Sequence, residues 1–164
     1  MTRIAIIPGD GIGVEVTRQA TKLLRALSES GRMALELVEW DLGAERYLRT
    51  ASAITEDEMT ALGRDYDAIF LGAIGDPRIP DNAHAREILL GLRFRLDLYI
   101  NLRPVRLYDA RLSPLRDIRP ADLDLIVFRE NTEGVYVGMG GWFRKGTPDE
   151  VAIQEDINTR RGVE

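Results

Sequence analysis

One short segment near the start of the chain constrains the fold more than any other. Residues 4–7 read Ile-Ala-Ile-Ile, a mostly β-branched run that Pro8 and Gly9 close. Such a run favours a buried strand that enters a loop. From Ile12 to Leu27 the apolar residues recur at helical spacing, which predicts a helix directly after this loop. A buried strand followed at once by a helix is typical of an α/β sheet.

The next segments continue this alternation of strand and helix. Residues 34–40 alternate as a second strand, and a loop and a short helix follow. Thr55 is expected to cap a further helix whose first turn is acidic, as the helix dipole favours. Residues 67–72 predict a third strand. The resulting β-α-β-α-β order predicts an α/β sheet with helices on both faces.

The second half of the chain predicts one more helix and several strands. A polar loop rich in proline and aspartate leads into an expected helix at residues 83–98. Residues 102–107, 123–128 and 150–155 are expected to be strands. Before the last of these, residues 138–146 are rich in glycine and aromatic side chains.

Composition excludes several classes of protein. The chain has 164 residues, of which 45% are hydrophobic and 30% charged, as in an ordinary globular protein. A net charge of −5 argues against a nucleic-acid partner, and the apolar runs are too short to cross a bilayer. The absence of cysteine excludes disulfides and thiolate metal sites. Without a signal-peptide layout at its start, the chain is expected to be cytoplasmic.

Arginines among apolar residues are the best clue to function. Arg93 and Arg103, ten residues apart, could grip one carboxylate from a helix end and the following strand. Tyr136, seven residues past Arg129, would add a phenol that can donate or accept a proton. This pattern predicts a small site for a di- or tricarboxylic acid. The alternative is that the arginines only pair with carboxylates of the chain itself, namely Asp97, Glu130 and Glu133.

Four motifs together resemble a known family. They are Gly-Asp-Gly-Ile-Gly at 9–13, Gly-Ala-Ile-Gly-Asp-Pro at 72–77, Asn-Leu-Arg-Pro at 101–104 and Arg-Glu-Asn-Thr-Glu-Gly at 129–134. In this order and spacing they resemble the isocitrate/isopropylmalate dehydrogenase family of metal-dependent, NAD(P)-linked oxidative decarboxylases. The resemblance runs from Ile4 to the last residue. Residues 89–93 and 146–152 are most similar to the isopropylmalate branch.

The resemblance implies a two-domain α/β sandwich with a mixed sheet, which is not a conventional Rossmann fold and is incomplete in this chain. Residues 1–100 would form the N-terminal part of the first α/β domain, which later residues of a longer chain would complete. Residues 101–164 would begin a second domain for dimerisation and substrate binding. Its arm, at about 138–157, would pair with the arm of a second subunit. We therefore expect the N-terminal part of a homodimeric enzyme, inactive by itself.

The family chemistry oxidises a secondary alcohol by hydride transfer to NAD and then removes the β-carboxylate as CO2, with Mg2+ or Mn2+ as Lewis acid. By position, Arg93, Arg103 and Arg129 match the substrate-binding arginines. Tyr136 matches the tyrosine that protonates the enolate carbon; the alternative is a core tyrosine with a satisfied hydroxyl. The metal ligands are expected outside this chain. The only histidine, His84, is expected to be solvated in a polar loop.

Two glycine-bearing loops are expected near the nicotinamide. The first lacks the third glycine of the dinucleotide fingerprint, since Val14-Glu15-Val16 follows directly, so it does not predict a Rossmann site. The resemblance implies cofactor contacts from Ile12, Gly72, Ala73, Ile74, Gly75 and Asp76. Glu87 is a further candidate, although its spacing to Arg93 is one residue short of the family pattern. The alternative for both loops is strand-to-helix turn chemistry alone.

The substrate is expected to be a 2-hydroxy diacid with a branched alkyl group, such as 3-isopropylmalate. Leu89 and Leu90 precede Arg93 by four and three residues, so on a helix they form an apolar patch beside it. Isocitrate would instead require a hydroxyl or a cation at this patch. Alternatively, both leucines belong to the core. Rival functions are oxidation of tartrate, D-malate or isocitrate by a relative of the same family, or a non-catalytic carboxylate-binding fragment.

Overall fold

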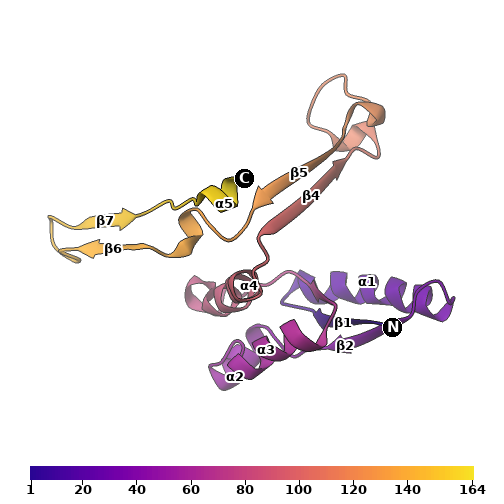
Figure 1. The fold of residues 1–164 in the computed structure, drawn as a ribbon, viewed down its shortest axis with the longest axis horizontal. Coiled ribbons are helices and arrows are strands. Elements are labelled where there is room, and N and C mark those ends of the chain that lie inside the picture. The colour runs from indigo at the N-terminus through magenta and orange to yellow at the C-terminus, as the bar shows by residue number, and fades with distance from the viewer. The chain divides into compact units, whose positions relative to one another are not determined.

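The computed structural model describes all residues, 1–164, and the chain forms two compact units, Met1–Leu96 and Asp97–Glu164. The first unit contains a parallel sheet with helices, and the second contains antiparallel strands. Figure 1 shows the elements in chain order. The predicted α/β class is confirmed, and its parallel and antiparallel strands lie in separate sheets of this chain.

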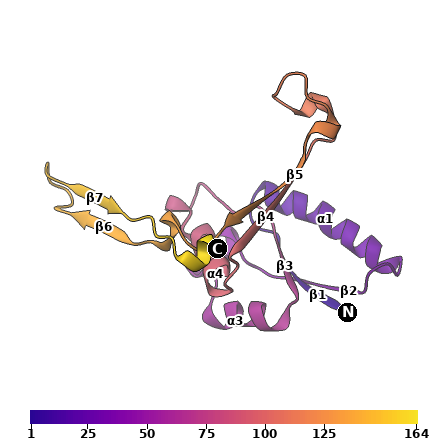
Figure 2. The ribbon, with the colours of Figure 1, turned by 45° about the horizontal axis from the view of Figure 1, so that its top comes forward.

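The sheet of the first unit has the order β2-β1-β3, and all its strands are parallel. The central strand β1 (Thr2–Ile7) is the buried run with which the chain begins, and it lies between β2 (Leu35–Glu39) and β3 (Ala68–Leu71). Figure 2 shows the three strands side by side. Ala5, in register with both neighbours, is fully buried. A strand buried on both faces favours a continuous apolar run over an alternating one.

The helices of this unit follow the sequence closely. They are α1 (Ile12–Glu29), α2 (Ala44–Thr50), α3 (Glu56–Asp65) and α4 (Ala83–Arg95), with a 3-10 turn at Pro80–Asn82. Thr55 caps α3 as predicted, since its hydroxyl accepts the Glu58 amide at 3.3 Å and its own amide donates to Glu58 at 2.8 Å. Helix α4 ends earlier than expected, at Arg95, because Asp97 takes a left-handed backbone.

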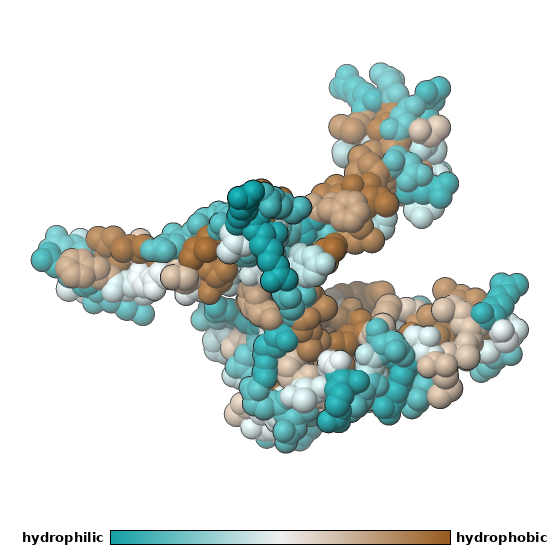
Figure 3. Space-filling view, in the orientation of Figure 1, coloured by the Kyte–Doolittle hydropathy of each residue, from teal (hydrophilic) through white to brown (hydrophobic).

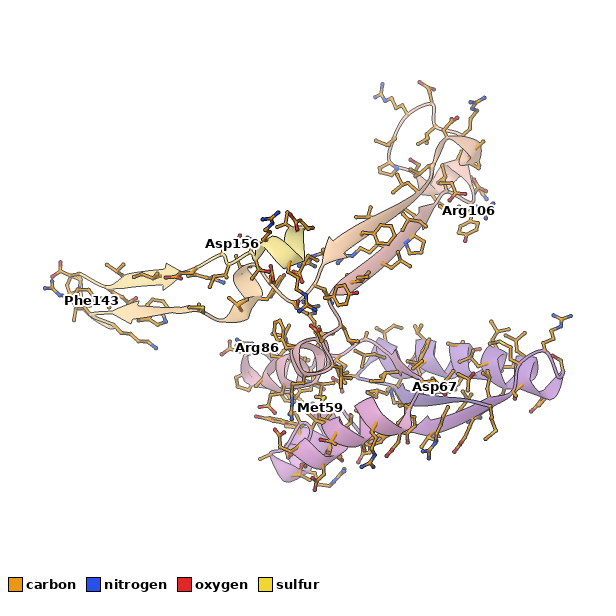
Figure 4. All side chains as sticks on the ribbon, viewed as in Figure 1. Met59, Asp67, Arg86, Arg106, Phe143 and Asp156 are labelled. Atoms are coloured by element: carbon orange, nitrogen blue, oxygen red, sulfur yellow. The ribbon has the colours of Figure 1, made fainter.

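The core of the first unit joins the sheet to helices α3 and α4. Its buried side chains are those of Ala5, Ile7, Leu42, Ala53, Met59, Leu62, Ile88 and Leu92. Met59 is labelled in Figure 4, where it lies in this core. Helix α1 is less well covered, and an apolar hollow of about 310 Å3 lies between α1 and β3. No helix of the chain is long and apolar enough to span a membrane.

The second unit consists of two antiparallel strand pairs and short helical turns. Strand β4 (Ile100–Arg106) pairs with β5 (Asp124–Glu130), and β6 (Gly140–Phe143) pairs with β7 (Val151–Gln154) in a hairpin. The short helix α5 (Arg160–Val163) follows. Hydrophobic side chains cover much of the β4–β5 ribbon (Figure 3). Leu107 is the only buried hydrophobic residue here, so the strands leave most of their apolar area uncovered.

We predict that replacing Glu58 by Gln in the full-length protein lowers the thermal midpoint by a few degrees at neutral pH. Both guanidinium ends of Arg46 donate to this carboxylate, at 2.6 and 2.8 Å, and such a partly exposed pair contributes about 1 kcal/mol or less. The Arg46 hydrogen bond lowers the pKa of Glu58 to about 2 from an ordinary value of 4.5. The stabilisation is therefore complete above pH 4.5 and is lost as the pH falls toward 2.

Thermal unfolding followed by circular dichroism at several pH values checks this prediction. The difference between the two proteins should shrink as the pH falls through this window. A difference that stays constant down to the acid end would contradict it.

Candidate functional site

Two of the predicted substrate arginines share one face of the β4–β5 ribbon. Asn101 lies directly opposite Arg129, and Arg103 is two residues further along β4. Because side chains alternate along a strand, all three point to the same side. Arg103 Nε donates to the amide oxygen of Asn101 at 2.8 Å. The guanidinium of Arg129 lies 5.4 Å from the ring centre of Tyr136, a cation–π distance. The ribbon thus groups two cations with the predicted proton donor.

The neighbouring glutamates do not neutralise these two arginines. The Glu130 carboxylate instead accepts the Thr132 amide and hydroxyl, both at 2.7 Å, and the Glu133 amide at 2.8 Å. Burial acts to raise the pKa of Glu130, but these hydrogen bonds lower it below its ordinary value overall. Glu133 accepts the Thr159 amide at 2.7 Å. For Arg103 and Arg129, the structure therefore shows no pairing with Glu130 or Glu133, which was one part of the alternative.

A hollow of about 790 Å3 lies beside this ribbon within the second unit. Its wall carries the cations Arg129 and Arg161, hydroxyl groups from Tyr99, Thr132 and Thr159, and the carboxylates of Asp97, Glu130, Glu133 and Glu164. Arg103 and Tyr136 do not line it. Of the predicted second-unit residues, only Arg129 thus meets both the ribbon face and the hollow.

On helix α4, the residues that face the core differ from those of the predicted apolar patch. Ile88 and Leu92, four residues apart, are the buried pair. Leu89 is 43% exposed, while Leu90 and Arg93 are half-buried. Leu89 is therefore not a core leucine, which leaves the patch beside Arg93 open to another group. Glu87 is exposed on the same helix.

The two glycine-bearing loops touch each other at the carboxyl ends of β1 and β3. The Asp10 amide donates to Ala73 O at 2.7 Å. A Cβ atom on Gly9 or Gly13 would meet that same oxygen at 2.1 or 2.4 Å, and one on Gly72 would meet Pro8 O at 2.0 Å. The loops can approach this closely only because glycine stands at these positions. The carboxyl edge of parallel strands is also where α/β sheets bind ligands.

The remaining cofactor candidates lie around this contact. The Ile12 side chain is 64% exposed at the start of α1. The Asp76 carboxylate is held by Arg78, whose Nε and Nη2 donate to it at 2.9 and 2.7 Å. These bonds lower the pKa of Asp76 to about 2. Arg78 thus occupies this side chain, so the loop offers a ligand mainly its backbone.

The expectation for His84 is wrong. Its side chain is fully buried on α4, and its Nε2 lies 2.8 Å from Asp10 Oδ2. Asp10 also accepts the amides of Ala44 at 2.6 Å and Gly75 at 2.9 Å. The sequence signal was present, since His84 precedes the apolar Ile88 by four residues and so shares its inward face. The expectation failed because His84 was assigned to the polar loop that precedes α4.

No group of three or more histidine, aspartate or glutamate side chains in the chain is arranged to hold a metal ion. The residues present therefore do not fit a divalent metal site by themselves. At the glycine loops, Ala73 and Gly75 are exposed at the carboxyl edge of the sheet, so their backbone is accessible to a ligand.

Comparison with known proteins places this arrangement in a family. The family model described as isocitrate/isopropylmalate dehydrogenase matches residues 3–164. The chain therefore belongs to this family.

Its curated relatives include enzymes named 3-isopropylmalate dehydrogenase. Those of Thermobifida fusca and Bifidobacterium longum are 48% and 52% identical to this chain over 162 residues, which is 99% of the chain and 46% of each relative. That of Corynebacterium kroppenstedtii is 50% identical over 163 residues and is covered to 47%. The chain thus spans about half the length of these relatives.

Solved structures agree on the fold. A β-decarboxylating dehydrogenase from Thermococcus kodakarensis has a TM-score of 0.63 at 30% identity, covering 99% of this chain and 42% of that one. An isocitrate dehydrogenase from Methylococcus capsulatus has a TM-score of 0.76 at 24% identity, covering 99% and 44%. The predicted resemblance and fold class are therefore confirmed.

We predict that Gly72→Ala destabilises the full-length protein by about 1–3 kcal/mol, the usual cost of overpacking. The new methyl group would meet Pro8 O at 2.0 Å and Thr17 Oγ1 at 2.6 Å, so the two loops must separate. Gly91→Ala is the matched control, because its methyl group meets only the flexible end of Met59, at 3.1 Å. Urea denaturation measures both variants. Equal urea midpoints for Gly72→Ala and Gly91→Ala would show that the two loops can accommodate the extra methyl group.

Proposed function

We propose that the protein containing this chain oxidises and decarboxylates 3-isopropylmalate with NAD as the hydride acceptor, as a step of leucine biosynthesis. The main support is the identity of 48–52% to relatives that carry the name 3-isopropylmalate dehydrogenase. The pair of arginines on one ribbon face, without carboxylate partners in the chain, is consistent with a dianionic substrate. The rest of the protein must supply what this chain lacks.

Arg93, Arg103 and Arg129 bind the substrate carboxylates in this proposal. A guanidinium presents two parallel donors to a carboxylate and remains charged at any working pH. A hydrogen bond to a charged group contributes roughly 1.5–3 kcal/mol, so losing one arginine should cost at least about tenfold in kcat/KM. To bind a carboxylate, Arg103 gives up only its hydrogen bond to the Asn101 amide oxygen. This neutral acceptor competes only weakly with an anion for the guanidinium.

The apolar patch of Leu89 and Leu90 receives the branched alkyl group of the substrate. Leu89 is exposed rather than packed in the core, so it is available for such a contact. Neither leucine offers a hydroxyl or a cation to a third carboxylate, such as isocitrate carries. This patch is the reason to prefer 3-isopropylmalate over isocitrate, tartrate or D-malate.

Tyr136 is the proposed general acid that protonates carbon after CO2 leaves. A phenol hydroxyl can donate its proton directly to that carbon. Arg129 lies against its ring at 5.4 Å. That contact would hold the ring in one orientation beside a cation that binds substrate.

The backbone of the two glycine loops faces the nicotinamide in this proposal, with Ile12, Gly72, Ala73, Ile74, Gly75, Asp76 and Glu87 as contacts. NAD supplies the hydride acceptor when bound. Mg2+ or Mn2+, held by residues outside this chain, would polarise the substrate oxygen. We further propose that residues 1–100 and 101–164 belong to two different domains and that the enzyme is a cytoplasmic homodimer.

The substrate assignment predicts that the full-length enzyme uses 3-isopropylmalate with NAD and Mg2+ or Mn2+ far better than isocitrate, D-malate or tartrate. Replacing Leu90 by a polar residue such as Asn should lower this discrimination by about 1–3 kcal/mol, the usual worth of a small apolar group. Steady-state kcat/KM with each acid measures it. A comparable kcat/KM for isocitrate would remove the substrate assignment but leave the family intact.

The acid role predicts that Tyr136→Phe lowers kcat by about 10²–10⁴-fold while substrate binding stays close to normal. The ring and its contact with Arg129 remain, and only the hydroxyl is lost. Because hydride transfer precedes carbon protonation, the keto-acid intermediate formed by hydride transfer should be released. Mass spectrometry can detect this intermediate, which differs from the final product by the β-carboxylate that it still carries. Near-normal kcat with weaker binding would instead make Tyr136 a structural residue.

The dimer proposal concerns the β6–β7 hairpin, whose tip carries Phe143 (Figure 4). Trp142 and Phe143 are each 58% exposed, and Ile153 is 54% exposed, so the hairpin is more apolar than a free surface usually is. We predict that deleting residues 140–156 from the full-length protein yields an inactive monomer by light scattering. An active dimer after this deletion would place the contact elsewhere.

A further inference from the structure

The buried pair of Asp10 and His84 has no part in the chemistry proposed above. Asp10 is 8% exposed and His84 is fully buried, and 74 residues separate them in sequence. A buried carboxylate is costly unless donors surround it. Here three donors converge on it, from three different parts of the first unit: Ala44 N, Gly75 N and His84 Nε2.

The pair acts on one of the loops proposed to face the nicotinamide. Asp10 holds this loop twice, because its amide donates to Ala73 O and its Oδ2 accepts the Gly75 amide. The Ala73 backbone packs against Gly9 and Gly13, whereas Gly75 is exposed, so little packing fixes the Gly75 backbone. The next anchors of the loop, at Asp76, involve the nearby residues Arg78 and Asn82. Asp10 therefore ties the loop to the end of β1.

The imidazole of His84 has one hydrogen-bond partner in the chain, and that partner is Asp10. Its Nε2 donates to Oδ2, but its buried Nδ1 has no hydrogen-bond partner. An unmet buried polar atom costs free energy, and the bond from Nε2 to the buried carboxylate offsets that cost. The ring of Tyr47, with its centre 5.9 Å away, restricts the imidazole to this position. The residue is thus suited to present one donor to one oxygen.

We propose that Asp10 and His84 form a positioning pair that fixes residues 73–76 in the conformation that binds the nicotinamide cofactor. The pair does not touch the reacting atoms. His84 orients the carboxylate, and the carboxylate orients the Gly75 amide and the backbone beside it. This inference depends on the proposed NAD-linked function of the full-length enzyme.

Two variants of His84 in the full-length enzyme test the pair. His84→Leu removes the donor at similar volume, and His84→Gln restores a donor near the position of Nε2. We expect His84→Leu to raise KM for NAD about tenfold, the effect of losing one well-placed hydrogen bond, with little change in KM for 3-isopropylmalate. Hydrogen exchange of the peptide around residues 72–79 should become faster. His84→Gln should recover most of both properties.

Glu58→Gln is the matched control, because it weakens an ion pair of the same unit that does not involve this loop. It should lower the thermal midpoint without changing KM for NAD. If His84→Leu behaves like this control, or if His84→Gln fails to recover KM for NAD while folding normally, the positioning role is wrong.

The same experiments separate this proposal from the proposed function. A wild-type enzyme that does not reduce NAD with 3-isopropylmalate overturns the function, and with it the cofactor step of this inference. Hydrogen exchange alone then tests whether the pair fixes the loop. Unchanged exchange of residues 72–79 in His84→Leu would show that it does not. An active wild-type enzyme with an unchanged KM for NAD in His84→Leu overturns the pair and leaves the function standing.

Discussion

The close contact between the loops at residues 9–13 and 72–75 is the constraint on which the first unit depends. It joins the carboxyl ends of β1 and β3, and it exists only because no side chain separates Gly9, Gly13 and Gly72 from the opposing backbone. Asp10 extends the contact to α2 and α4 through Ala44 and His84. One carboxylate therefore sets the geometry of the sheet edge where an α/β protein binds its ligand.

The second unit depends on a different physical condition. A two-stranded ribbon buries little by itself and is at best marginally stable in water. Phe128 is 70% exposed on β5, and only Leu107 is buried among the hydrophobic residues of this unit. These strands therefore need further surface to cover them. The same ribbon carries Arg103 and Arg129 on one face, so the part with the least core holds the clearest candidates for anion binding.

The functional groups in the chain are consistent with its family, but they do not include a metal site. The chain offers guanidinium groups, a tyrosine and a glycine-lined sheet edge, which are suited to bind an acid, deliver a proton and admit a cofactor. It has no cluster that could hold a metal ion. The chain spans about half the length of its relatives, so the reaction proposed above is assigned to the full-length protein and not to these residues alone.

The sequence by itself determined what depends on near neighbours and on ordered motifs. The strand at residues 4–7, the Thr55 cap and the family could all be predicted from the sequence. Each depends on residues close in sequence or on the spacing of motifs: an apolar run, a hydrogen bond from residue i to i+3, and four ordered motifs. Only the tertiary structure decided the burial of His84, because its partner lies 74 residues away. It also decided that Thr132 and Thr159, and not the arginines, satisfy Glu130 and Glu133. Pairing by sequence distance cannot rank such competing donors, because their geometry exists only after the chain has folded.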